Sequence, residues 1–109
     1  MKILLDENLP VKLKLSFAND HEIRTVRKMG WAGKRNGELL RLMVLGGFDA
    51  FITIDKNLQY QQNISRYPIR LFILDAPDNK LNTLPPYVER LGSLLSDPPT
   101  EMVFTISLG

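Results

Sequence analysis

The stretch KILLDENLP, residues 2–10, sets the fold class of this chain. Residues 2–5 suit a buried β-strand, and Asp6 follows them directly. In open α/β sheets ligands bind at the carboxyl ends of the strands, so Asp6 is better placed for chemistry than for packing. The pattern recurs in AFITIDKN, residues 50–57, where Asp55 follows a second apolar run. Two strands that each deliver an aspartate predict a shared acidic pocket, which suits a divalent metal ion.

Strand-like and helix-like segments alternate along the whole chain, which favours a mostly parallel sheet covered on both faces. Helical spacing or helix boundaries predict helices at residues 10–17, 36–45 and 84–95. Strands are expected at residues 2–5, 22–26, 50–54, 69–74 and 101–107, the last one at a sheet edge. We therefore predict a single domain, residues 1–109, with a three-layer α/β/α sandwich of about five strands and about four helices.

Two helices carry specific expectations about their ends and faces. Pro10 is expected in the first turn of the helix at residues 10–17, where proline is tolerated. Asn36 is expected to cap the helix that follows it. That helix is expected to bury an apolar face that includes Met43 and Val44, and the Gly46-Gly47 pair should end it.

Composition excludes several classes of protein. The 109 residues are 44% hydrophobic and 24% charged, as in ordinary globular proteins. The chain has no cysteine, which excludes a disulfide framework, thiolate metal sites and a cysteine nucleophile. No apolar run approaches the roughly 20 residues of a membrane span, and the N-terminal apolar run is broken at Asp6, unlike a secretory signal. We expect a cytoplasmic protein that does not enter a membrane.

The distribution of charge is more informative than the formal net charge of +2. Residues 24–41 hold six lysines and arginines and the single tryptophan, Trp31. Two interpretations stay open. The segment is either a solvated loop with Trp31 packed on the core, or a surface that follows phosphates and offers an aromatic ring for base stacking.

The candidate metal ligands are Asp6, Asp55 and Glu38, the last in the first turn of the helix before the third strand. Carboxylates from different strand ends supply the hard oxygen ligands that Mg²⁺ and Mn²⁺ prefer. Asn8 and Asn57 each follow an aspartate by two residues and could bind the metal, a metal-bound water or the substrate. Each acid also has a structural interpretation, because helix caps use the same residue types.

The sequence resembles the short PIN-like domains found in bacterial toxin–antitoxin operons. The resemblance covers roughly the first 60 residues. It is carried by residues 4–10 (LLDENLP), 30–33 (GWAG), 36–40 (NGELL) and 53–58 (TIDKNL).

This resemblance implies a metal-dependent endoribonuclease that acts as the toxin of a toxin–antitoxin pair. Asp6 and Asp55 match the first and last acids of the family pattern, and Glu38 falls near the acid that opens the intervening helix. The three would hold Mg²⁺ or Mn²⁺ and activate a water to attack an RNA phosphodiester. Asn57 would orient water or substrate, and the cations Lys34, Arg35 and Lys56 would contact flanking phosphates.

The family's further helical glutamate has no counterpart here, so a second hypothesis is a PIN-like module without catalysis. In that case the acidic pocket would bind a partner such as an antitoxin. A third, lower-ranked hypothesis is a receiver domain with Asp55 as phosphoacceptor. The apolar last strand, residues 102–106, would also offer an edge for pairing in a homodimer.

Overall fold

The computed structural model describes residues 1–61 and 63–109, and its centre is a five-stranded sheet in which every neighbouring pair is parallel. The strand order is β2-β1-β3-β4-β5. The strands are β1 (Lys2–Leu5), β2 (Glu22–Thr25), β3 (Ala50–Thr53), β4 (Arg70–Leu74) and β5 (Val103–Ile106). The helices are η1 (Val11–Ser16), α1 (Asn36–Leu45), α2 (Leu58–Gln61), η2 (Ile64–Arg66) and α3 (Pro85–Ser96). The predicted three-layer α/β fold is confirmed.

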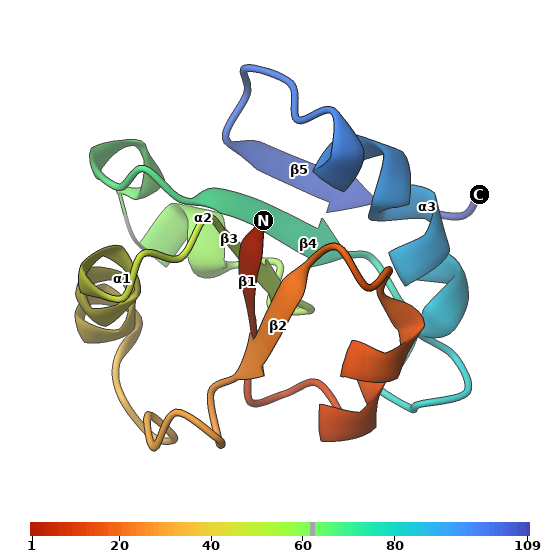
Figure 1. Cartoon of the computed structure of the whole chain (residues 1–109), viewed down its shortest axis with the longest axis horizontal. Helices are drawn as coiled ribbons and strands as arrows, with labels where there is room; N and C mark the ends of the chain where they lie inside the picture. Colours follow the sequence, from red (N-terminus) through yellow and green to blue (C-terminus); the bar gives the residue numbers. More distant parts are fainter. Residues whose placement is uncertain (62) are drawn as a thin grey trace.

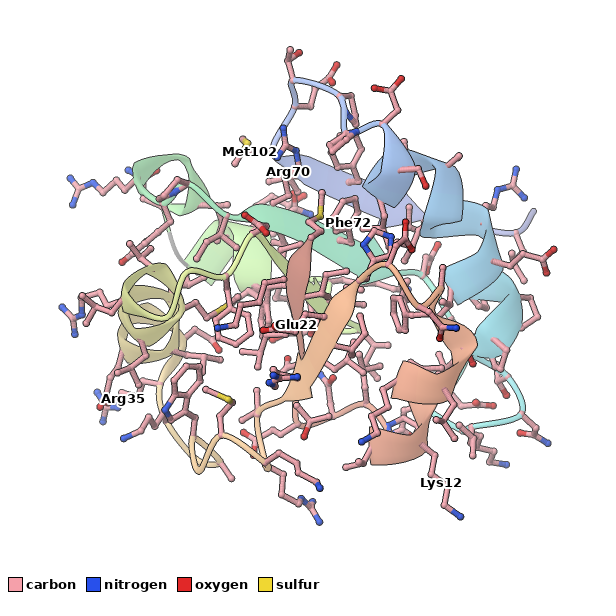
Figure 2. The ribbon with its side chains drawn as sticks, in the orientation of Figure 1. Lys12, Glu22, Arg35, Arg70, Phe72 and Met102 are labelled. Carbon is pink, nitrogen blue, oxygen red and sulfur yellow. The ribbon has the colours of Figure 1, made fainter. Side chains whose placement is uncertain are left out.

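Helical layers cover both faces of the sheet (Figure 1). Alternate residues of each strand enter two separate cores, because successive side chains of a strand point to opposite faces. Ile3 and Leu5 pack with η1 and α3, whereas Leu4 packs with α1, α2 and η2. Phe72 of β4 lies in the first of these cores, on the side of α3 (Figure 2). Burial on both faces explains why the strand sequences are nearly continuous apolar runs.

The first predicted helix differs from expectation in type. Residues 11–16 form a 3₁₀ helix, with the Leu13 N–H donating to the Pro10 carbonyl, and Pro10 lies in extended backbone before the helix rather than in its first turn. The predicted apolar face is nevertheless buried, since Leu9, Leu13 and Phe17 are at most 9% exposed. The helix is a short piece of six residues within the connection between β1 and β2, and the tighter 3₁₀ form occurs mainly in such short pieces.

Helix α1 also corrects two expectations. Arg35 occupies the N-cap position in extended backbone, and Asn36 is already the first helical residue, so Asn36 is not the cap. Val44, expected on the buried face with Met43, is 40% exposed, and Leu45 is 84% exposed. The helix ends as expected at Gly46, and Gly47 takes a positive φ of 75° that turns the chain into β3.

The order of the strands creates a switch point at the centre of the sheet. From β1 the chain moves to β2 on one side, and then returns past β1 to add β3, β4 and β5 on the other side. In open α/β sheets ligands bind at the carboxyl ends of the two strands where the direction reverses, here β1 and β3. Strand β5 is at an edge, as predicted. In the part of the chain that the structure describes, no helix is long and apolar enough to cross a membrane.

Candidate functional site

The two aspartates singled out by the sequence lie at the switch point, where β1 and β3 end. Leu5 and Ile52 are paired in the ladder, and the Asp6 N–H continues it by donating to the Ile52 carbonyl at 2.9 Å. Asp55 follows the end of β3 by two residues. Because the strands are parallel, both carboxylates are delivered to the same edge of the sheet.

Thr53, the last residue of β3, links the acidic residues. Its hydroxyl donates to Asp6 Oδ2 at 2.7 Å. The same oxygen accepts from the Asp55 backbone N–H at 3.0 Å and from Asn8 Nδ2 at 3.3 Å. A hydroxyl has one hydrogen and two lone pairs, so these three bonds use all of its capacity. Thr53 is fully buried and therefore fixes the relative positions of the three residues around it.

The Asp6 carboxylate is held in an environment that opposes its negative charge. Burial is the largest influence and raises the pKa of Asp6 above its ordinary value of 3.8. Hydrogen bonds from Thr53 and from the Glu7 backbone N–H, which donates to Asp6 Oδ1 at 2.8 Å, lower this pKa in part. The nearby negative charges of Glu7 and Asp55 raise it further. A cation bound at this edge would relieve both the burial and the repulsion.

Asn8 adds an oxygen that has no hydrogen-bond partner among the described residues. Its Oδ1 is buried, while its Nδ2 is bound to Thr53. Its backbone carbonyl accepts from Asn79 Nδ2 at 2.9 Å, which holds the segment after β4 against this edge. A buried acceptor without a partner costs free energy, so a ligand that supplies a donor or a positive charge here would be stabilised.

A hollow of about 260 Å³ opens beside Asp6 on the side of β2. Its polar lining comes from the ends of three strands: Asp6, Glu7, Asn8, Thr25, Arg27 and Asn79. Asp55 is not among the residues that line it, in the described part of the chain. The lining of the hollow therefore combines acidic residues with one basic residue, Arg27.

Glu38, the third predicted metal ligand, is engaged elsewhere. Its Oε1 lies 3.2 Å from Nζ of Lys34, which stands four residues earlier, before the start of α1. Within residues 1–61 and 63–109, no group of three or more histidine, cysteine, aspartate or glutamate side chains is placed to hold a metal ion. The structure thus brings Asp6 and Asp55 together around Thr53, without assembling Glu38 into one cluster with them.

The predicted phosphate-contacting cations are also partly engaged. Lys34 pairs with Glu38, and Lys56 forms an ion pair with Asp75 that holds the pKa of this aspartate below its ordinary value. Arg35 is exposed and lies at the outer edge of the molecule (Figure 2). These three cations do not line the hollow beside Asp6, as far as the described residues show.

Asn57, the remaining predicted substrate contact, takes part in a turn. Its backbone N–H donates to Asp55 Oδ1 at 3.0 Å, and its side chain is exposed. The bond occupies one lone pair of the Asp55 carboxylate and orients it toward the start of α2. Asp55 therefore has a structural role in the turn before α2. Its carboxylate keeps further lone pairs for a ligand.

The basic loop between β2 and α1 is fastened to the acidic edge. The Gly33 N–H donates to Glu7 Oε2 at 3.3 Å, and the positive φ of Gly33, 80°, shapes the loop at that contact. Trp31 is half-buried, and its ring meets Phe48 edge-on at a centroid distance of 5.8 Å. Of the two interpretations of Trp31, the structure supports packing on the core.

Sequence reasoning gave no site role to Thr53, Thr25 and Asn79, and named Arg27 only as one cation of the basic segment at residues 24–41. Thr53 had a signal, because it is a polar residue that closes an otherwise apolar strand. The position of Arg27, Thr25 and Asn79 beside Asp6 had no signal, since they meet it only through the order of the strands and the path of the loops.

Comparisons of the chain with models of protein families, with curated proteins and with solved structures found no significant match. The PIN-like resemblance therefore stays a prediction from the sequence.

The raised pKa of Asp6 predicts a pH-dependent gain in stability for Asp6→Asn in metal-free buffer. The folded state binds the proton of Asp6 more tightly than the unfolded state, so deprotonation destabilises the fold. This loss of unfolding free energy is absent well below pH 3.8. It grows as the pH rises from there through the raised pKa, and it is constant above that pKa. The variant should be more stable than the wild type at pH 7 and equally stable near pH 3, by urea unfolding with EDTA present. A variant less stable at pH 7 would contradict this account.

The role of Thr53 predicts unequal effects of two substitutions. Thr53→Val removes the hydroxyl and leaves the buried groups of Asp6, Asp55 and Asn8 without their shared partner, at a cost of about 1–3 kcal/mol in unfolding free energy. Thr53→Ser keeps the hydroxyl and should retain most of that free energy. Urea unfolding of both variants gives the comparison, and a loss in Thr53→Ser without a loss in Thr53→Val would mean that the methyl group rather than the hydroxyl matters.

Proposed function

We propose that the protein is a Mg²⁺- or Mn²⁺-dependent endoribonuclease that cleaves RNA at the carboxyl edge of its sheet. The observation that carries the proposal is the pair Asp6 and Asp55, delivered by adjacent parallel strands at the switch point and joined through Thr53. Ligand-binding sites of α/β sheets occur at this position.

The donor atoms of the site fit a hard divalent cation. Asp6 and Asp55 offer carboxylate oxygens, and Asn8 offers a buried amide oxygen that lacks a hydrogen-bond partner within the described residues. Mg²⁺ prefers oxygen ligands and usually keeps several waters, so two carboxylates and an amide are a sufficient protein contribution. When bound, such an ion lowers the pKa of a coordinated water and stabilises charge on a phosphate.

The chain's own residues supply the rest of the chemistry. Thr53 holds the Asp6 carboxylate in one orientation, which avoids a cost of ordering it when a ligand binds. Arg27 lines the same hollow, and its guanidinium would pair with a phosphate next to the scissile bond. The side-chain amide of Asn79 donates a hydrogen bond to the backbone carbonyl of Asn8 and so holds Asn8 in place.

The choice of RNA as the substrate, and of an antitoxin as partner, rests on the resemblance to PIN-like domains. The basic loop that is hydrogen-bonded to Glu7 supports the proposal of a polyanionic substrate. Its lysines and arginines lie next to the acidic edge, where they would contact phosphates of a bound RNA. A homodimer through β5 belongs to the same proposal.

The engagement of Glu38 favours a second candidate, a PIN-like module that binds a partner without cleaving RNA. With Glu38 paired to Lys34, only two aspartates remain for the metal. Such a site would accept a basic side chain from a partner protein in place of a metal ion.

Millimolar Mn²⁺ should raise the melting temperature of the wild type and not of Asp6→Asn/Asp55→Asn. A ligand that binds only the folded state stabilises it by about 2.7 kcal/mol at roughly 100 times its Kd.

Asp55→Asn alone should abolish Mn²⁺-dependent cleavage of a labelled RNA while the fold is kept. Asp97→Asn, an exposed aspartate after α3, is the matched control and should behave as the wild type.

Two results would contradict the nuclease. Cleavage by Asp55→Asn at the wild-type rate would remove Asp55 from the chemistry. Absence of any Mn²⁺ effect on the wild type would favour the binding module.

Arg27→Ala should weaken RNA binding by about tenfold in an Asp55→Asn background, because it removes a phosphate contact inside the hollow. Arg90→Ala, an exposed arginine on α3, should have little effect. Fluorescence anisotropy with a labelled RNA at fixed salt measures both. A larger loss for Lys34→Ala or Lys56→Ala than for Arg27→Ala would restore the cations predicted from the sequence.

A further inference from the structure

A second hollow, of about 300 Å³, lies between the end of α1 and the segment that precedes β4. Its lining consists of Arg41, Val44, Leu45, Arg66, Tyr67 and Pro68. Leu45 is 84% exposed and Val44 40% exposed, although both belong to a helix whose other leucines are mostly buried. Leu15 of η1 is also exposed, but it does not line this hollow. Contiguous exposed apolar side chains around a hollow mark an interaction site more often than single ones do.

Two cations stand at the margins of this apolar surface. Arg41 and Arg66 are both exposed, and neither guanidinium has an acidic partner in residues 1–61 and 63–109. None of the described residues that line the hollow is an aspartate or a glutamate. The surface therefore combines apolar side chains with two positively charged arginines beside them.

The topology places this surface at the amino edge of the sheet. Gly46 and Gly47 join α1 to the start of β3, and Pro68 precedes the start of β4 by two residues. α1 and the segment before β4 lie on the same side of the molecule (Figure 1). Asp6 and Asp55 lie at the opposite, carboxyl edge, so an occupant of this surface would leave the acidic site accessible.

We infer that the surface docks an acidic amphipathic segment of another polypeptide. Leucine-like side chains of the partner would fill the hollow between Val44 and Tyr67, and its carboxylates would pair with Arg41 and Arg66. A second copy of this chain is disfavoured, because a two-fold contact would bring the arginines of the two copies together. RNA would pair with the arginines but leave the apolar side chains without a matching surface. The inference stands independently of the proposed nuclease activity.

Two labelled helical peptides test the inference by fluorescence anisotropy with the full chain. One carries leucines on one face with glutamates beside them, and the other has lysine in place of each glutamate. The wild type should bind the glutamate peptide about tenfold more tightly than the lysine peptide. Arg41→Glu/Arg66→Glu should reverse this preference, and Leu45→Ser should weaken the glutamate peptide. Lys12→Glu/Lys14→Glu, on η1, makes the same charge change elsewhere and should keep the wild-type preference.

Three results would overturn the inference. The first is equal affinity for both peptides, or a preference that Arg41→Glu/Arg66→Glu leaves unchanged. The second is an RNA oligonucleotide that loses affinity in this double variant while the peptides are not discriminated. The third is a wild-type dimer, seen by analytical ultracentrifugation, that Leu45→Glu dissociates. Because the substituted side chains are exposed, circular dichroism should show that every variant folds.

Discussion

The parallel pairing of β1 with β3 is the constraint on which the rest of this structure depends. It places the sheet's switch point between these two strands and sends Asp6 and Asp55 to one edge. It also places β1 inside the sheet, where Ile3 and Leu5 point into one core and Leu4 into the other, so both faces of the sheet must be covered. The same pairing therefore accounts for the buried layers and for the gathering of charge where the strands end.

Thr53 orders the residues around the two aspartates through the hydrogen bonds of its hydroxyl. A buried carboxylate needs hydrogen bonds or a cation, and Thr53 supplies one hydrogen bond while holding Asn8 and the Asp55 backbone. The compensation is incomplete, because the pKa of Asp6 is still raised. A site that opposes its own charge in this way is typical of functional sites, where ligand binding supplies the missing interaction.

The two ends of the sheet have contrasting chemistry. The carboxyl edge is acidic, with Arg27 beside it, and its polar groups come from loops after β1, β2 and β4. The second hollow, at the amino edge, has an apolar and basic lining, with Leu45 exposed at the end of α1. Catalysis and docking assigned to opposite ends can operate without competing for space. In the two proposals, a partner bound at the second hollow would leave the acidic edge accessible.

The sequence by itself determined the parallel sheet, the positions of its strands and the two aspartates at strand ends, because apolar runs and the residues that stop them are local signals. The structure decided which of the predicted residues meet. Glu38 and Lys34 are four residues apart on the chain and pair with each other, whereas Asp6 and Thr53 are 47 positions apart and meet only because β1 lies next to β3. Arg27 and Asn79 reach the hollow, and Val44 is left exposed, for the same reason. Strand order and packing are set by the whole chain, so no short stretch of sequence encodes them.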